Sequence, residues 1–292
     1  MTEQTAYRPR RSVLYLPSSN ERALEKAKTL PVDALILDLE DAVAPDAKDT
    51  ARENACAAVR SGEYGRRELT IRVNSIGSQW HDADLAAAAT AGPDAIVVPK
   101  VGSAQEVRSL VAAMEAAGAP AHTRLWAMVE TPVAVLHAEE IARASDRLTC
   151  LVLGTNDLYK ELGAVFVPGR AAVHTALQLV LLAARASGAA VVDGVYNDVD
   201  DADGFLAEAR QGRELGFDGK TLIHPGQVEP CNDVFSPTAD EVEQARAVIA
   251  AFETAQAQGR GVATLGGRLI ESLHVDTAQK VIATAEAISA LS

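Results

Sequence analysis

The sequence contains few aromatic residues, few cysteines and no long hydrophobic run. Phe, Trp and Tyr make up 4% of the 292 residues, so we expect a core built mainly from Ala, Val, Leu and Ile. The longest apolar runs, such as residues 176–184, are much shorter than the roughly 20 residues of a membrane-spanning helix, so no membrane association is predicted. Three widely separated cysteines provide neither a disulfide framework nor a CxxC site, which predicts a reducing, cytoplasmic environment.

Basic residues are also scarce. The chain has 27 Lys and Arg against 40 Asp and Glu, a formal net charge of −13, which disfavours nucleic acid and anionic membrane surfaces as partners. The negative charge is distributed unevenly along the chain, because residues 1–30 contain six basic and only three acidic side chains. This basic N-terminal edge therefore predicts a phosphate-bearing ligand. No HxxxH, HExxH or GxSxG motif occurs, which argues against a zinc site and against a serine nucleophile.

Short aliphatic runs alternate with longer, Ala-rich amphipathic stretches along the first three quarters of the chain. Nearly continuous apolar strands, each followed by a helix, are typical of a parallel sheet that is covered on its faces. Eight such strands predict a (β/α)8 TIM barrel. An open doubly wound sheet is the alternative, although its glycine fingerprint is missing after the first strand. The predicted strands are 12–16, 34–38, 69–73, 95–98, 125–129, 151–153, 190–192 and 220–223. The predicted helices of this part are 21–29, 46–60, 82–91, 104–117, 132–144, 171–187 and 203–215.

The pattern changes after residue 223. We expect a barrel domain over residues 1–225 and a C-terminal extension over 226–292. Residues 225–232 are predicted as a loop, 238–256 as a helix, and 275 to the end as a second helix. Four glycines lie between the two helices, at positions 259, 261, 266 and 267. A Gly-rich arm of this kind is a candidate lid or a segment exchanged between subunits.

Polar residues follow the predicted strands, where a barrel of this type carries its chemistry. Glu130 and Asp157 follow consecutive strands, which lie about 4.7–4.9 Å apart in a sheet, so their carboxylates could share one ion. Two carboxylates without a thiolate or imidazole suit a hard cation such as Mg2+. The competing interpretation is a capping Glu and a turn Asp.

Arg72 lies inside a predicted strand, where a permanent charge is costly unless it is paired. One interpretation is a structural ion pair with Asp38 or Glu40. The other is a guanidinium directed at a substrate carboxylate or at a developing enolate. The sequence leaves both open.

The ordered set of motifs resembles the citrate lyase beta-subunit family, with its malyl-CoA and citramalyl-CoA lyase relatives within the HpcH/HpaI aldolase/citrate lyase superfamily. Any single motif is weak, but their order along nearly the whole chain is specific. The motifs are RSVLYLP at 11–17, DLEDAV at 38–43, RVN at 72–74, PK at 99–100, ETP at 130–132, GTND at 154–157, GFDGK at 216–220 and IHP at 223–225.

The resemblance implies a Mg2+-dependent barrel, a homotrimer or a multiple of one, that cleaves the C–C bond of a 3-hydroxy-3-carboxyl acyl thioester. By this match Glu130 and Asp157 bind Mg2+, Glu130 also contacts substrate, and Arg72 contacts the reacting centre. Arg22 and Lys28 match residues for the phosphates of CoA or an acyl carrier. Glu271 replaces an Asp that the family places on an arm reaching a neighbouring subunit, and it is the expected proton carrier.

The resemblance leads to a mechanistic hypothesis. A base removes the proton of the 3-hydroxyl, and the substrate separates into a 2-oxo acid and a thioester enolate. Arg72 offsets the negative charge, and Glu271 from a second chain protonates the enolate carbon. The citryl, malyl and citramalyl groups stay open at this point. Two alternative hypotheses about the function stay open. One is a pyruvate- or phosphoenolpyruvate-type Mg2+ barrel enzyme without a thioester substrate, and the other is a non-catalytic subunit of a larger complex.

Overall fold

The computed structural model describes residues 8–291. The chain divides into two compact units, one over residues 10–235 and one formed by residues 236–291 together with Arg8 and Pro9. Within the part that the structure describes, no helix has the length and the apolar character needed to cross a bilayer.

The larger unit is a closed barrel of eight parallel strands in sequential order, which confirms the predicted (β/α)8 fold. The barrel closes where Ser12–Leu14 of the first strand pair with Lys220–Leu222 of the last. All eight predicted strands are present, with ends that differ by a few residues at most. The strands are β1 (Ser12–Pro17), β2 (Ala34–Asp38), β3 (Glu68–Arg72), β4 (Ala95–Val98), β5 (Arg124–Val129), β6 (Leu148–Leu153), β7 (Ala190–Asp193) and β8 (Gly219–Leu222).

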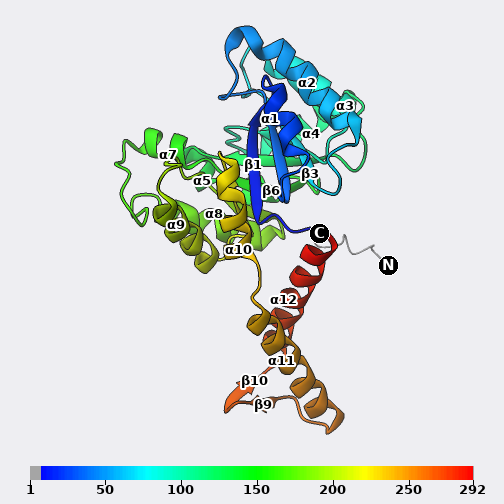
Figure 1. Ribbon diagram of the computed structural model, residues 1–292, viewed down its shortest axis with the longest axis vertical. Helices are drawn as coiled ribbons and strands as arrows, with labels where there is room; N and C mark the ends of the chain where they lie inside the picture. Colours follow the sequence, from blue (N-terminus) through cyan, green and yellow to red (C-terminus); the bar gives the residue numbers. More distant parts are fainter. Residues whose placement is uncertain (1–7, 292) are drawn as a thin grey trace. The chain divides into compact units, whose positions relative to one another are not determined.

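Helices surround the strands, as Figure 1 shows for α2, α3 and α4 around β1 and β3. The predicted helix over 132–144 is two short helices that meet at His137. The barrel helices are α1 (Glu21–Ala27), α2 (Lys48–Ser61), α3 (His81–Ala91), α4 (Ala104–Ala116), α5 (Pro132–Leu136), α6 (Ala138–Ala142), α7 (Thr155–Leu162), α8 (His174–Ser187), α9 (Ala202–Leu215) and α10 (Val228–Phe235).

The prediction of a loop over 225–232 was wrong. Residues Pro225–Gln227 form a 3-10 turn and α10 follows it directly. Pro230 lies in the first turn of α10, where a missing backbone N–H removes no helical hydrogen bond. Because α10 packs on β1, β8 and α9, it belongs to the compact unit that ends at Phe235.

The two ends of the barrel interior differ in character. Alternate strand residues point inward and form an apolar layer that includes Val13, Ile36 and Trp126. At the N-terminal end, Arg10 forms a two-point ion pair with Glu68, at 2.6 and 2.8 Å, and its guanidinium lies 5.1 Å from the Trp126 ring centroid. This end is filled, so the opposite end is left for a ligand.

The C-terminal unit is a helical hairpin with a small two-stranded sheet. Helices α11 (Ala239–Ala257) and α12 (Ser272–Leu291) pack against each other, and β9 (Ala263–Leu265) pairs antiparallel with β10 (Arg268–Ile270). Gly266 and Gly267 form the two-residue turn between the strands, with φ of 55° and 79°. Positive φ at both turn positions suits the right-handed twist of a hairpin, which explains the paired glycines.

Candidate active site

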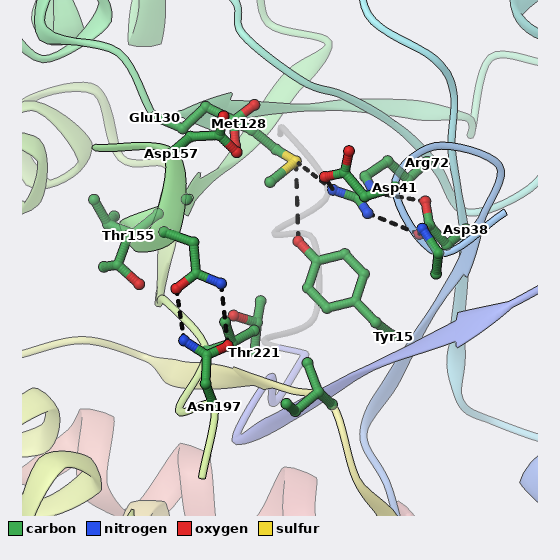
Figure 2. A pocket seen from close by; sticks show the side chains of 16 residues that line it. Tyr15, Asp38, Asp41, Arg72, Met128, Glu130, Thr155, Asp157, Asn197 and Thr221 are labelled. Atoms are coloured by element: carbon green, nitrogen blue, oxygen red, sulfur yellow. Dashed lines mark hydrogen bonds and ion pairs between the residues drawn. The ribbon is translucent and has the colours of Figure 1, made fainter. Parts of the chain in front are cut away.

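A pocket of about 300 Å³ opens at the C-terminal end of the barrel strands (Figure 2). Its lining comes from strands or following loops on several sides of the barrel, which brings residues distant in sequence together. The lining side chains that matter for the chemistry are Tyr15, Asp38, Arg72, Met128, Glu130 and Asp157.

Glu130 and Asp157 lie next to each other in this pocket (Figure 2). Glu130 directly follows β5 and is 2% exposed, while Asp157 belongs to the first turn of α7. Gly154 makes room for Glu130, because a Cβ at position 154 would lie 2.2 Å from Glu130 Oε2. The spacing of the strand ends thus places both carboxylates at one side of the pocket.

Lys100 holds this carboxylate pair from one side. Its backbone N–H donates to Glu130 Oε1 at 2.9 Å, and its ammonium lies 3.6 Å from Asp157 Oδ1. The φ of Lys100 is 55°, in the left-handed region that non-glycine residues seldom adopt. A single residue after β4 therefore contacts both acidic side chains, one through its backbone and one through its side chain.

The carboxylate pair suits a divalent cation. Burial, followed by the negative charge of Asp157, raises the pKa of Glu130 to about 7. A cation would relieve this repulsion. No group of three or more His, Cys, Asp or Glu side chains within residues 8–291 is arranged to hold a metal. Mg2+ needs only one or two protein carboxylates, with water and substrate oxygens as its other ligands, so these two residues fit it.

Arg72, at the end of β3, forms the ion pair that one of the two interpretations predicts, and it is also exposed to the pocket. Its guanidinium forms a two-point ion pair with Asp38, with both contacts at 2.7 Å, and its Nη1 lies 3.0 Å from Glu40. It also lines the pocket (Figure 2). Burial raises the pKa of Glu40 to about 8, although Arg72 acts in the opposite direction. The ion pair orients Arg72, and the cavity leaves it accessible to a ligand.

Sequence reasoning missed two residues at the pocket floor. The Tyr15 ring centroid lies 4.8 Å from the Arg72 guanidinium carbon, and the Tyr15 hydroxyl donates to Met128 Sδ at 3.9 Å. Tyr15 and Met128 lie on β1 and β5. Their inward direction follows from strand register, which no local motif encodes.

The remaining predicted site residues are not among those that line this pocket. Arg22 and Lys28 lie on or directly after α1, and neither lines the pocket. Lys28 is paired with Glu25 and, at 2.6 Å, with Glu63. Glu271 belongs to the C-terminal unit, where it is exposed and its backbone N–H donates to His274 Nδ1 at 3.0 Å.

A family model described as HpcH/HpaI aldolase/citrate lyase matches residues 11–225. The chain belongs to this family. The match covers the barrel from the start of β1 to the turn after β8, and therefore includes every residue of the pocket described above.

Relatives within this family are similar over nearly their whole length. A protein of Cereibacter sphaeroides named (3S)-malyl-CoA thioesterase is 51% identical over 282 residues, which cover 97% of this chain and 96% of the relative. Citrate lyase subunit beta of Escherichia coli K12 is 37% identical over 289 residues, covering 97% and 96%. These relatives carry two different activity names, so membership of the family leaves the bond that is cleaved undecided.

Solved structures agree with the fold. CitE of Mycobacterium tuberculosis, in complex with magnesium, acetoacetate and coenzyme A, is 29% identical and superimposes with a TM-score of 0.77 over 95% of this chain and 98% of its own. A citrate lyase structure from Burkholderia xenovorans, 19% identical, has a TM-score of 0.85 and covers 98% and 94%. The second likeness concerns the fold alone.

Proposed function

We propose that the protein is a Mg2+-dependent enzyme that acts on the CoA thioester of a malyl-type acid, with Glu130 and Asp157 as its metal ligands. The observation that carries the proposal is the pair of converging carboxylates beside Arg72 in an open pocket. The full-length similarity to a malyl-CoA thioesterase and to a structure that holds magnesium and coenzyme A supports it.

The charge of the pocket favours an acyl group with one free carboxylate. Four acidic side chains line it, and Arg72 is the one basic side chain among its described lining residues. Arg72 already faces Asp38 and Glu40. A citryl group carries a second free carboxylate, which would need a further cation, whereas malyl and citramalyl groups carry one. Apolar lining residues such as Leu153 and Val195 suit a hydrogen or a methyl substituent.

The residues then have separate tasks. When bound, Mg2+ supplies a Lewis acid for the hydroxyl and carboxylate oxygens of the acyl group. Glu130 and Asp157 hold the ion, and Lys100 orients Glu130 through its backbone N–H. Arg72 stabilises negative charge on the thioester oxygen, which develops both when water attacks the carbonyl carbon and when an enolate forms.

Two bonds of such a substrate can break. We propose hydrolysis of the C–S bond as the main reaction, supported by the 51% identity to a thioesterase. Cleavage of the C–C bond, the lyase reaction expected from the family resemblance, is the second candidate, favoured by the similarity to citrate lyase beta subunits. Hydrolysis gives malate and free CoA, whereas C–C cleavage gives glyoxylate and acetyl-CoA.

The decisive experiment identifies the products. Malyl-CoA, citramalyl-CoA and citryl-CoA are incubated with the protein and Mg2+, and products are measured by mass spectrometry. Glu130→Ala and Asp157→Ala should each abolish Mg2+-dependent turnover. Full turnover in both variants, or binding of pyruvate or oxalate without any binding of CoA, would refute the proposal and favour an aldolase without a thioester substrate.

Assembly as a homotrimer, with Glu271 serving a neighbouring subunit, is part of the same proposal. Light scattering after size exclusion measures the assembly. Mixing inactive Glu271→Ala and Glu130→Ala proteins tests the exchange, because a mixed trimer contains sites in which both residues are intact. Recovered activity supports the shared site, and unrecovered activity in a demonstrated mixed trimer contradicts it.

The carrier and the compartment complete the proposal. We favour CoA over an acyl-carrier protein because one relative is named for a CoA ester and a similar structure holds coenzyme A. We place the phosphates of CoA near Arg22 and Lys28, on or directly after α1. A reducing cytosol is supported by three buried cysteines, none of which forms a disulfide.

A further inference from the structure

Four charged side chains are buried together behind the pocket wall, and the proposed reaction does not use them. Asp193 ends β7, Lys220 lies in β8, Glu208 in α9, and Arg170 in the loop between α7 and α8. Their exposed fractions are 0%, 0%, 8% and 1%. We refer to these four residues as the β7 charge cluster.

The β7 charge cluster is electrically neutral and tightly connected. Arg170 Nη1 lies 2.7 and 2.8 Å from the two oxygens of Asp193. Lys220 Nζ lies 2.7 Å from Glu208 and 3.3 Å from Asp193. Well-packed apolar residues in place of a buried ion pair often leave the stability of a protein unchanged or raise it. A contribution to stability is therefore a weak explanation for such a cluster.

A second set of contacts leads from the cluster to the pocket. Lys220 Nζ also donates to the backbone carbonyl of Gly194. The α-carbon of Gly194 is pressed against Thr155, because a Cβ at position 194 would lie 2.4 Å from Thr155 Oγ1 and 2.6 Å from its Cγ2. Thr155 is the first residue of α7, and Asp157 follows two positions later in the same turn.

The chain beyond α7 is anchored to the same cluster. Arg170 adopts a φ of 57°, its Nε donates to Gln211 at 2.8 Å, and Gln211 in turn donates to the carbonyl of Gly169 at 2.8 Å. The strained backbone of Arg170 persists because its buried side chain is fixed. Gly194 therefore contacts α7 at its first residue, and Arg170 anchors the chain eight residues after the helix ends at Leu162.

We propose that the β7 charge cluster is a positioning device that holds the first turn of α7 where Asp157 faces Glu130. Lys220 holds the Gly194 carbonyl by a hydrogen bond, and the close contact with Gly194 sets the position of Thr155. The position of Asp157 is then determined by the helix geometry, because it lies two residues later in the same turn. The inference rests on the proposed function, because it takes Asp157 as a metal ligand. It assigns a role to Arg170, Asp193, Glu208 and Lys220 as positioning residues, not catalytic ones.

The test measures metal affinity without substrate. Mn2+ binding to the full chain is followed by electron paramagnetic resonance for wild type and for a charge-balanced double variant, Lys220→Met with Glu208→Gln. The matched control is Arg10→Met with Glu68→Gln, which removes a buried ion pair at the other end of the barrel. We expect the Mn2+ dissociation constant to rise about 10- to 100-fold in the first variant only, as for other residues that orient metal ligands.

The outcomes distinguish a failure of the proposed function from a failure of the positioning role of the β7 charge cluster. If wild type binds no Mn2+, the proposed function fails. If wild type binds Mn2+ and the Lys220/Glu208 variant binds it equally well, the positioning role fails, whatever the loss of thermal stability.

A steric variant gives an independent measurement if the charge variant does not fold. The φ of Gly194 is not in the left-handed region, so alanine fits the backbone and the substitution acts only through the overlap of its Cβ with Thr155. Gly194→Ala should therefore raise the Mn2+ dissociation constant. Adding Thr155→Ala removes the two closest contacts and should recover most of the affinity. Equal affinity in wild type and Gly194→Ala, or no recovery in the folded double variant, contradicts the proposed connection.

Discussion

Substituting Gly154 by alanine is the sharpest test of how the fold places Glu130. The φ of Gly154 is −101°, which alanine adopts without strain, so the substitution changes only the space that Glu130 occupies. The added Cβ would lie 2.2 Å from Glu130 Oε2, 2.4 Å from its Cβ and 3.0 Å from its Cδ. All three contacts involve one side chain, so Glu130 must move.

The expected displacement can be estimated from contact distances. Non-bonded heavy atoms are comfortable at about 3.5 Å, so the contact at 2.2 Å requires a shift of roughly 1 Å. The distance from a ligand atom to its metal ion can deviate by only about 0.2 Å. A misplacement of about 1 Å costs about 100-fold in rate. Overpacking costs about 1–3 kcal/mol, and each kcal/mol lowers Tm by roughly 2–4 °C in a domain of this size.

The assay compares Gly154→Ala with Gly102→Ala, in which the new Cβ would make ordinary contacts at 3.6 Å with Glu106 and 3.9 Å with Val133. Mg2+ affinity is measured by calorimetry, and kcat/KM is measured with malyl-CoA below the Tm of both variants. Gly154→Ala should lose about 100-fold in kcat/KM and bind Mg2+ more weakly, while Gly102→Ala stays near wild type. Wild-type affinity and rate in folded Gly154→Ala would refute the reasoning.

Three further expectations concern the charges of the site. Because the pKa of Glu130 is raised to about 7 and a protonated carboxyl does not bind the ion, Mg2+ affinity should fall about tenfold per pH unit below that value; calorimetry from pH 5 to 8 checks this, and a flat profile contradicts it. Arg72→Lys cannot keep the two-point contact with Asp38, so kcat/KM should fall about 100-fold, while an unchanged value would limit Arg72 to a structural role. Arg22→Ala should raise KM for the thioester more than Lys28→Ala, because Lys28 is already paired with two carboxylates; steady-state kinetics at low salt decides, and the reverse order contradicts the assignment.

The barrel was predictable because each strand carries its own signal. Buried parallel strands appear in the sequence as short aliphatic or β-branched runs, and this pattern located all eight, although β3 and β8 also contain charged residues such as Arg72 and Lys220. Helix α7 was missed because it is short and mostly polar, and α10 was missed because Pro225 and Pro230 read as loop residues. In both cases tertiary packing stabilises a helix that the local sequence does not predict.

The site was predictable only in part, for a related reason. Glu130 and Asp157 follow consecutive strands, and parallel strand ends converge, so their proximity needed no three-dimensional information. The left-handed backbone of Lys100 and the contact between Gly194 and Thr155 depend on how separate loops pack. Such contacts have no period or spacing in the sequence, so they become visible only in the folded chain.

The burial of all three cysteines has a practical consequence for enzymology. Cys56, Cys150 and Cys231 are each at most 5% exposed, and burial raises the pKa of Cys231 to about 12, which suppresses its reactive thiolate. A colorimetric thiol reagent should therefore give little background with the folded protein. Hydrolysis of a malyl thioester releases the free thiol of CoA, whereas C–C cleavage leaves it acylated. The colour of a single cuvette can thus report which bond the enzyme breaks.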